Sequence, residues 1–281
     1  MLREIRLGAP PPEAAKITIA NTSSTLSLMR ALLAAINCPK GEIEANLARH
    51  VAILHEAAEA GCDIAVFPEM SLTGYINPKI HADGSVKLRS DAVLELAEQT
   101  AKTGVGALFG IAERADKGGT LITQVFARNG RIDGSYSKRH LGEDEELFQA
   151  GDSPFTFSLN DVRFGAAICA ESGVAYPFGE PAADGASVVF HCSAPGLWGT
   201  RKTDVEWQDG FDWWHGECIE RLSAHAEEFG IWIAATGQAG STVDEDFPGW
   251  AGLFDPNGRL VTELPDWREA TLIADIPLDS R

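Results

Sequence analysis

Hydrophobic residues recur along most of this chain with the spacing of alternating strands and helices. From residue 29 onward, short apolar runs of strand length stand between segments with helical spacing, and later runs follow one another across turn signals. The strands at 121–128 and 131–136 meet at Asn129 and Gly130, a pair typical of a two-residue hairpin. The other predicted strands span 31–36, 64–67, 107–112, 162–169, 187–191, 231–236, 251–255, 259–263 and 271–276.

The helical spacing predicts helices over 42–60, 91–102 and 217–229. Gly61 ends the first of them. Its expected buried face carries Ile43, Leu47, Val51, Leu54 and Ala58. In the last helix the inward positions are expected to be Ile219, Leu222, Ala226 and Phe229.

This order of elements predicts an α/β fold. Strands alternate with helices at first and hairpins accumulate later, so the sheets should be mixed, with helices packed outside them. Residues 29–281 contain neither an internal repeat nor a linker and are expected to form one domain. Residues 1–28 are predicted to be an N-terminal extension, because they contain three consecutive prolines and the polar run 21–25.

Composition narrows the classes of partner. The chain has 281 residues, of which 44% are hydrophobic, so it can bury a substantial core. Its 23 basic and 41 acidic residues give a net charge of −18, which argues against nucleic acid or an anionic membrane as partner. No apolar run is long enough to span a membrane, and the first residues lack the apolar core of a signal peptide. The five cysteines are odd in number and lack metal-ligand spacing. A cytoplasmic protein with reduced thiols and no metal is therefore expected.

Three chemically complementary residues follow strands or turns. Glu69 ends the strand at 64–67, Lys138 follows the hairpin, and Cys169 closes an apolar strand. A thiolate is a nucleophile, and a nearby cation or base increases its population. The lysine could also stabilise an oxyanion, and the glutamate could move protons. Functional groups in α/β sheets gather beyond the carboxyl ends of strands, where Glu69 and Cys169 fall. The set predicts covalent acyl chemistry.

Two other interpretations use the same residues differently. Cys169 could pair with His140 or His191, as in Cys–His peptidases, which would leave Glu69 and Lys138 without a role. Alternatively, the chain could be a non-catalytic acidic binding protein. Ammonia release from an amide would separate an enzyme from a binding protein, and a lysine variant would separate the two enzyme mechanisms.

The residues around these three positions resemble the signatures of the nitrilase, or carbon–nitrogen hydrolase, superfamily. The three matching runs, in the family's order, are 66–69, 136–141 and 167–171. Further similar segments lie at 148–152, 185–189, 193–195 and 254–258. The resemblance implies a four-layer αββα sandwich of two mixed sheets, a catalytic triad of Glu69, Lys138 and Cys169, a thioester intermediate and no cofactor. It also implies a fourth residue, a glutamate. The distance from Lys138 favours Glu145, whereas counting back from Phe148 points to Asp144.

Departures from the family pattern bear on the substrate. The true nitrilase branch has tryptophan after the cysteine, whereas this chain has Ala170. An amide-type C–N bond of a small molecule is therefore the expected substrate, with release of ammonia or an amine; a nitrile or an N-carbamoyl compound is the alternative. Glu171, two residues after the cysteine, is expected to orient backbone and loops.

An aromatic stretch lies at 196–214. It holds Trp198, Trp207, Phe211, Trp213 and Trp214. These rings suit a substrate pocket or a subunit contact, and a loop folded onto the core is the alternative. With the helix at 217–229, they predict a homodimer or a larger even-numbered homo-oligomer.

Overall fold

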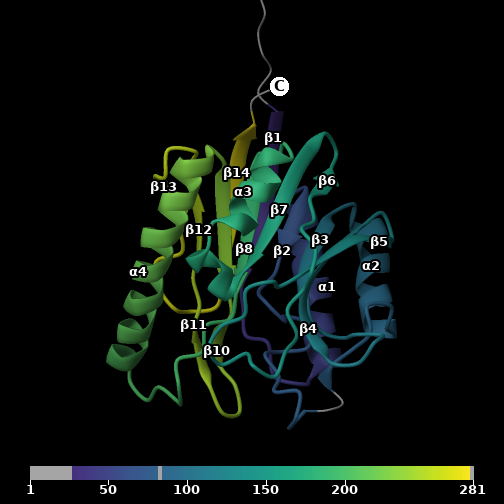
Figure 1. Ribbon diagram of the computed structural model, residues 1–281, viewed down its shortest axis with the longest axis vertical. Coiled ribbons are helices and arrows are strands. Elements are labelled where there is room, and N and C mark those ends of the chain that lie inside the picture. The colour runs from purple at the N-terminus through teal and green to yellow at the C-terminus, as the bar shows by residue number, and fades with distance from the viewer. Residues whose placement is uncertain (1–26, 82–83, 279–281) are drawn as a thin grey trace, which may run out of the picture.

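The computed structural model describes residues 27–81 and 84–278 of the chain. The first 26 residues of the predicted extension 1–28 lie outside the described residues, so that domain boundary stays a prediction. Figure 1 shows two sheets standing face to face between outer helices.

The first sheet is mixed and has six strands in the order β14-β1-β2-β3-β4-β5. Its central strands β1, β2 and β3 run parallel, and the outer pairings are antiparallel. Asn129 and Gly130 form the turn between β4 and β5, as predicted. The strands are β1 (Ser27–Ala35), β2 (Ile64–Val66), β3 (Gly106–Arg114), β4 (Thr120–Arg128), β5 (Arg131–Ser137) and β14 (Ala270–Leu278).

The second sheet has the order β13-β12-β9-β8-β7-β6 and is also mixed. Strands β7, β8 and β9 are parallel, and β6, β12 and β13 pair antiparallel at the two sides. Its strands are β6 (Phe157–Leu159), β7 (Val162–Ile168), β8 (Val188–Ser193), β9 (Trp232–Gly237), β12 (Ala251–Phe254) and β13 (Leu260–Glu263). A separate small ribbon pairs β10 (Ala239–Ser241) with β11 (Asp246–Pro248). The short strands β6, β10 and β11 were not predicted.

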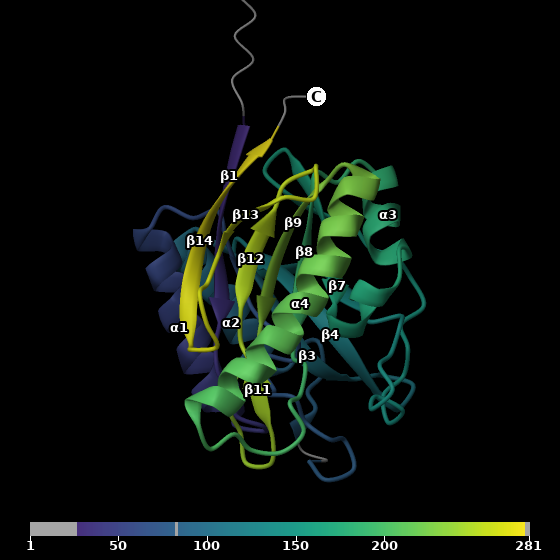
Figure 2. The ribbon, with the colours of Figure 1, turned by 90° about the vertical axis from the view of Figure 1, so that its left-hand side faces the viewer.

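Two helices cover the outer face of each sheet. Helices α1 (Ile43–Glu59) and α2 (Asp91–Thr103) pack on the first sheet, and α3 (Tyr176–Ala183) and α4 (Asp204–Phe229) on the second. A third apolar cluster, from strands of both sheets, fills the space between them. Figure 2 shows α3 and α4 in front of the second sheet. The predicted αββα fold is confirmed.

Helix α1 buries a more polar face than the one expected. Asn46 and His50 are buried, whereas Leu47 and Val51 are only partly buried. The amide of Asn46 donates to the carbonyls of Pro39 and Leu72 at 2.9 and 3.2 Å. Polar residues are buried here because they hold the loop after β2, which apolar spacing alone does not reveal.

Helix α4 begins earlier than predicted. The expected helix 217–229 is its second half, so most of the aromatic stretch is helical and not a loop. Thr203 starts the helix with a capping box: its hydroxyl accepts from the Glu206 N–H, and the Glu206 carboxylate accepts from the Thr203 N–H at 3.0 Å. The apolar period is weakened by Gly210 and Gly216, which obscured the first half.

Candidate active site

Glu69 lies in a tight turn just beyond the central strand β2. Met70 has a φ of 47°, in the left-handed region, and the turn packs directly against β3. Gly110 of β3 permits this approach, because a Cβ atom there would lie 2.2 Å from the Met70 nitrogen. The turn directs Glu69 inward, and its side chain is fully buried.

Cys169 occupies a similar turn at the end of β7 in the other sheet. Its φ of 44° is unusual for a residue with a side chain, and a 3-10 helix, η2 (Cys169–Gly173), begins there. Nε2 of His191 lies 3.0 Å from the Cys169 carbonyl oxygen, so that ring nitrogen must carry the proton. Cys169 is partly exposed, unlike Glu69. The turn therefore holds Cys169 at the margin of the core and not inside it.

Lys138 follows β5 and is fully buried between two carboxylates. Its Nζ atom lies 2.8 Å from Oε1 of Glu69 and 2.5 Å from Oε1 of Glu145. Asp144, the other acidic residue considered for the fourth position, is exposed. The structure therefore brings Glu145, and not Asp144, to the lysine. A buried ammonium between two carboxylates is fixed in position, and within 27–81 and 84–278 it has these two partners for its three N–H donors.

Backbone and hydroxyl donors hold both carboxylates. Oε2 of Glu69 accepts from the Ala194 N–H at 3.0 Å, in the loop after β8. Oε2 of Glu145 accepts from the Gly142 N–H at 2.6 Å, and its Oε1 accepts from the Tyr75 hydroxyl at 3.0 Å. Tyr75 was not predicted as a site residue. The sequence signal for it is its position in the loop that follows Glu69.

The electrostatics of the site suit proton transfer near neutrality. Burial, partly offset by the charge of Lys138, raises the pKa of Glu69 to about 7. Burial works to lower the pKa of Lys138, but the charges of Glu69, Cys169 and Glu145 outweigh it and raise that pKa, so the lysine is cationic. Burial and the charge of Glu69 raise the pKa of the Cys169 thiol well above its usual value. The thiol is therefore protonated near neutral pH.

Glu171 joins the cysteine turn to the lysine loop. Its Oε2 accepts from the Ile168 N–H at 2.8 Å. Its Oε1 accepts from the Tyr136 hydroxyl at 2.7 Å and from the Arg139 N–H at 2.8 Å. These contacts match the orienting role expected for this residue, because they fix the two segments that carry Cys169 and Lys138.

The Cys–His interpretation finds no matching geometry. His140 is exposed, and the ring of His191 faces the carbonyl oxygen of Cys169 and not its thiol. Burial lowers the pKa of His191 to about 4, so this ring is neutral. The Cys169 thiol instead contacts Glu69, and this hydrogen bond works to lower the pKa of the Glu69 carboxyl group.

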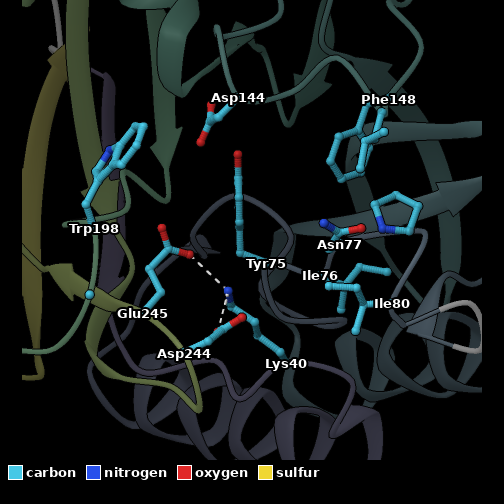
Figure 3. Close-up of a pocket in the computed structure, with 13 residues that line it drawn as sticks. Lys40, Tyr75, Ile76, Asn77, Ile80, Asp144, Phe148, Trp198, Asp244 and Glu245 are labelled. Carbon is cyan, nitrogen blue, oxygen red and sulfur yellow. Dashed lines mark hydrogen bonds and ion pairs between the residues drawn. The ribbon is translucent and has the colours of Figure 1, made fainter.

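A pocket of roughly 320 Å³ opens beside this cluster. Tyr75 connects the two, because its ring lines the pocket and its hydroxyl is bonded to Glu145 (Figure 3). The other lining side chains are mostly acidic or apolar and include Lys40, Asp144, Phe148, Trp198, Asp244 and Glu245. A small molecule bound there would lie next to the buried charges.

The aromatic stretch divides between three environments. Trp198 lines the pocket and is 85% exposed. Phe211 and Trp214 are buried in the core beneath α4. Trp213 is half exposed and lines a separate apolar hollow beside Trp198. Only one ring of the stretch therefore faces the pocket beside the buried cluster.

Within 27–81 and 84–278, no group of three or more histidine, cysteine, aspartate or glutamate side chains could hold a metal ion. In the same ranges, no helix is long and apolar enough to cross a membrane.

Comparison with known protein families gives one match that covers most of the chain. The family model described as carbon-nitrogen hydrolase matches residues 32–281. This range includes every residue of the buried cluster.

Two kinds of curated protein are similar in sequence. The glutamine-dependent NAD(+) synthetase of Rhodobacter capsulatus is 26% identical over 88% of this chain and 43% of its own length. The 2-oxoglutaramate amidase of Bacillus subtilis is 28% identical over 72% of this chain and 73% of its own length. The chain therefore spans less than half the length of the synthetase it matches.

Solved structures share the fold. An amidase from Nesterenkonia sp. superposes with a TM-score of 0.74 at 24% identity, over 89% of this chain and 91% of that one. The glutamine-dependent NAD+ synthetase of Acinetobacter baumannii gives a TM-score of 0.74 at 19% identity, over 89% of this chain and 45% of that one.

Proposed function

The chain belongs to the carbon–nitrogen hydrolase family, and on that premise we propose that it hydrolyses an amide-type C–N bond of a small molecule through a thioester on Cys169. The convergence of Glu69, Lys138 and Glu145 beside this cysteine carries the proposal. These residues come from three segments: the turn after β2, the loop after β5, which carries both Lys138 and Glu145, and the turn after β7.

The first half of the reaction forms the thioester. The sulfur of Cys169 attacks the carbonyl carbon while its proton passes to Glu69, whose pKa of about 7 suits a base near neutrality. The third N–H of Lys138 donates to the oxyanion that forms. When the C–N bond breaks, Glu69 returns the proton to the leaving nitrogen, and ammonia or an amine departs.

The second half returns the enzyme to its starting state. Glu69 takes a proton from water, and the resulting hydroxide attacks the thioester carbonyl carbon. Lys138 again donates to the oxyanion. The C–S bond then breaks, the carboxylic acid product leaves, and the proton held by Glu69 restores the Cys169 thiol. Glu145 keeps Lys138 in place throughout, because it remains bonded to the ammonium.

An amide is a better substrate for this arrangement than a nitrile. Thiolate attack on an amide gives an oxyanion directly, which the Lys138 N–H can meet, whereas a nitrile first gives a thioimidate. Ala170 after the cysteine, in place of the tryptophan of true nitrilases, favours the same choice.

Cys169→Ala tests the nucleophile. The variant is expected to fold and to release no ammonia from amides that the wild type cleaves, and the wild type is expected to show an acyl adduct on Cys169 by mass spectrometry with a slow substrate. Cys62→Ala, which changes a cysteine remote from the site at the end of α1, serves as the matched control. Ammonia release by the Cys169→Ala variant at the wild-type rate would exclude this mechanism.

Glutamine is a second candidate substrate. Several relatives are named glutamine-dependent NAD(+) synthetases, and the match covers most of this chain but under half of each of those proteins. Ammonia release from glutamine at a higher specificity constant than from simple amides would favour this candidate.

We also propose that the chain self-associates through the first half of α4. Val205 and Trp213 of this helix are exposed, at 69% and 50%, and Trp198 lines a hollow together with Trp213. Light scattering should give at least a dimer, and the Trp213→Glu variant should weaken it. A monomer at working concentration would contradict the proposal.

A further inference from the structure

The outer pocket carries more negative than positive charge. Its lining includes three carboxylates, from Asp144, Asp244 and Glu245, and a single ammonium, from Lys40, among the residues that the structure describes. The lining therefore has an excess of two negative charges. A charged substrate group entering this pocket would meet that excess at short range.

Lys40 is already neutralised. Its Nζ atom lies 2.8 Å from Asp244 and 2.9 Å from Glu245, and its side chain is only 6% exposed. Burial alone would raise the pKa of Asp244, but the hydrogen bond and charge of Lys40 outweigh it and lower that pKa. The lysine is thus held in an ion pair and offers little to the anionic group of a ligand.

Asp144 is the carboxylate left for a ligand. It is exposed, and it has no salt bridge within 27–81 and 84–278. Figure 3 shows its carboxylate at the edge of the pocket, on the side toward which the Tyr75 hydroxyl points. The guanidinium of Arg201, which lines the neighbouring hollow, donates to the Trp198 carbonyl at 2.7 Å.

Aromatic rings complete the environment. Trp198, with 85% of its surface exposed, and Tyr75 both line the pocket. Aromatic faces attract ammonium and guanidinium groups through the negative potential of the ring. A carboxylate without a salt bridge, together with aromatic rings that line the same pocket, is the chemistry that recognises an organic cation.

We propose that this pocket binds a cationic end of the substrate, so that the protein selects amides bearing an ammonium or guanidinium group. This inference rests on the proposed amide hydrolysis, because Tyr75 places the pocket next to Glu145 and the reacting groups. The net charge of −18 adds long-range attraction for cations, which salt will screen.

Three amides of matched shape test the selection. In ω-aminovaleramide, hexanamide and adipamic acid, the same four-methylene chain ends in an ammonium, a methyl or a carboxylate. We expect kcat/KM from ammonia release to be about tenfold higher for the ammonium compound than for hexanamide, and lowest for adipamic acid. The advantage of the ammonium compound should shrink in high salt.

Substitutions in the lining test whether the preference for the ammonium compound arises in the pocket. Asp144→Asn should lower the ammonium-to-methyl ratio about threefold, and Asp144→Lys should reverse the order of the two charged amides. Glu146→Gln, in the same loop but outside the lining, is the control for charge. Trp198→Ala should also lower the ratio, with Trp213→Ala as its control. The two control variants, Glu146→Gln and Trp213→Ala, should leave the ratio unchanged.

A binding measurement distinguishes selection by the pocket from the proposed amide hydrolysis. Calorimetric titration of the Cys169→Ala variant with the same three amides measures selection without turnover. If no amide yields ammonia, the proposed function fails, and the titration still tests the pocket. The inference is overturned if ω-aminovaleramide neither binds nor reacts better than hexanamide, or if Asp144→Asn leaves the ratio unchanged.

Discussion

The same arrangement of charges occurs twice in this molecule, at two depths. Lys138 lies between Glu69 and Glu145, with all three side chains almost completely buried. Lys40 lies between Asp244 and Glu245, at the wall of the open pocket, where Asp244 is 53% exposed. Each triplet has one ammonium and two carboxylates at hydrogen-bonding distance.

The two triplets differ in the pKa of a carboxylate. Burial raises the pKa of Glu69 to about 7 despite its contact with Lys138. In the outer triplet the contact with Lys40 outweighs burial and lowers the pKa of Asp244. With partners of the same kind, the deeply buried carboxylate of Glu69 has the raised pKa that suits proton transfer, and the half-exposed carboxylate of Asp244 does not.

Replacing each lysine should produce the largest contrast. Lys138→Met leaves two buried carboxylates facing each other and removes the oxyanion donor, so kcat should fall about 100- to 1,000-fold and the free energy of unfolding by roughly 3–5 kcal/mol. Lys40→Met should cost less than this, because Asp244 and Glu245 keep contact with solvent, at 53% and 20% exposure. Steady-state kinetics on a neutral amide and urea denaturation measure both. Equal losses in the two variants would contradict the comparison.

The pH dependence of the rate gives the next largest effect. Since Glu69 must be ionised to accept the thiol proton, kcat/KM on a neutral amide should rise roughly tenfold per pH unit below its pKa of about 7 and level off above it. Asp244, whose pKa is lowered, should stay ionised through this range, so its ion pair with Lys40 should persist. A rate that is flat through this range would exclude Glu69 as the base.

The raised pKa of Glu69 also makes the stability of the fold depend on pH. Stability should fall as the pH rises, whereas the rate should increase. The pKa of Glu69 is raised above its ordinary value of 4.5, so the folded state holds a proton that the unfolded state has released. The contribution of Glu69 to folding is therefore fully present below about pH 4.5 and is lost as the pH rises through about 7. Glu69→Gln should remove this dependence, along with most of the activity.

The sequence could predict mixed sheets with helices outside them, because apolar spacing is a local pattern, whereas the four layers followed from the resemblance to a family. Apolar runs marked most of the long strands, and polar residues at their ends marked Glu69 and Cys169. Which acidic residue meets Lys138 could not be settled this way, because Asp144 and Glu145 are adjacent and only the turn at Gly142 directs one of them inward. The buried polar contacts of Asn46 also lie outside what periodicity can predict.

The start of α4, by contrast, could have been predicted from the sequence. Thr203 and Glu206 form a capping box that is visible in the sequence, and Phe211, Trp214 and Cys218 continue the buried spacing of the second half. Aromatic side chains are typical of binding surfaces, but Phe211 and Trp214 of this stretch belong to the core.

Removing the Tyr75 hydroxyl should give the smallest effect, and it probes the connection between the two triplets. Tyr75 donates to Oε1 of Glu145 at 3.0 Å, while its ring lines the outer pocket. Tyr75→Phe keeps the ring and removes one hydrogen bond to a charged group, so kcat/KM should fall about tenfold on every amide. The hydroxyl of Tyr176 has no hydrogen bond to the described residues, and Tyr176→Phe is the matched control, with no expected change. The tenfold loss should leave the ratio of ω-aminovaleramide to hexanamide intact, because the ring and Asp144 are unchanged. A change in that ratio without a general loss would mean that the hydroxyl acts on the substrate in the outer pocket, and that the inner triplet does not depend on it.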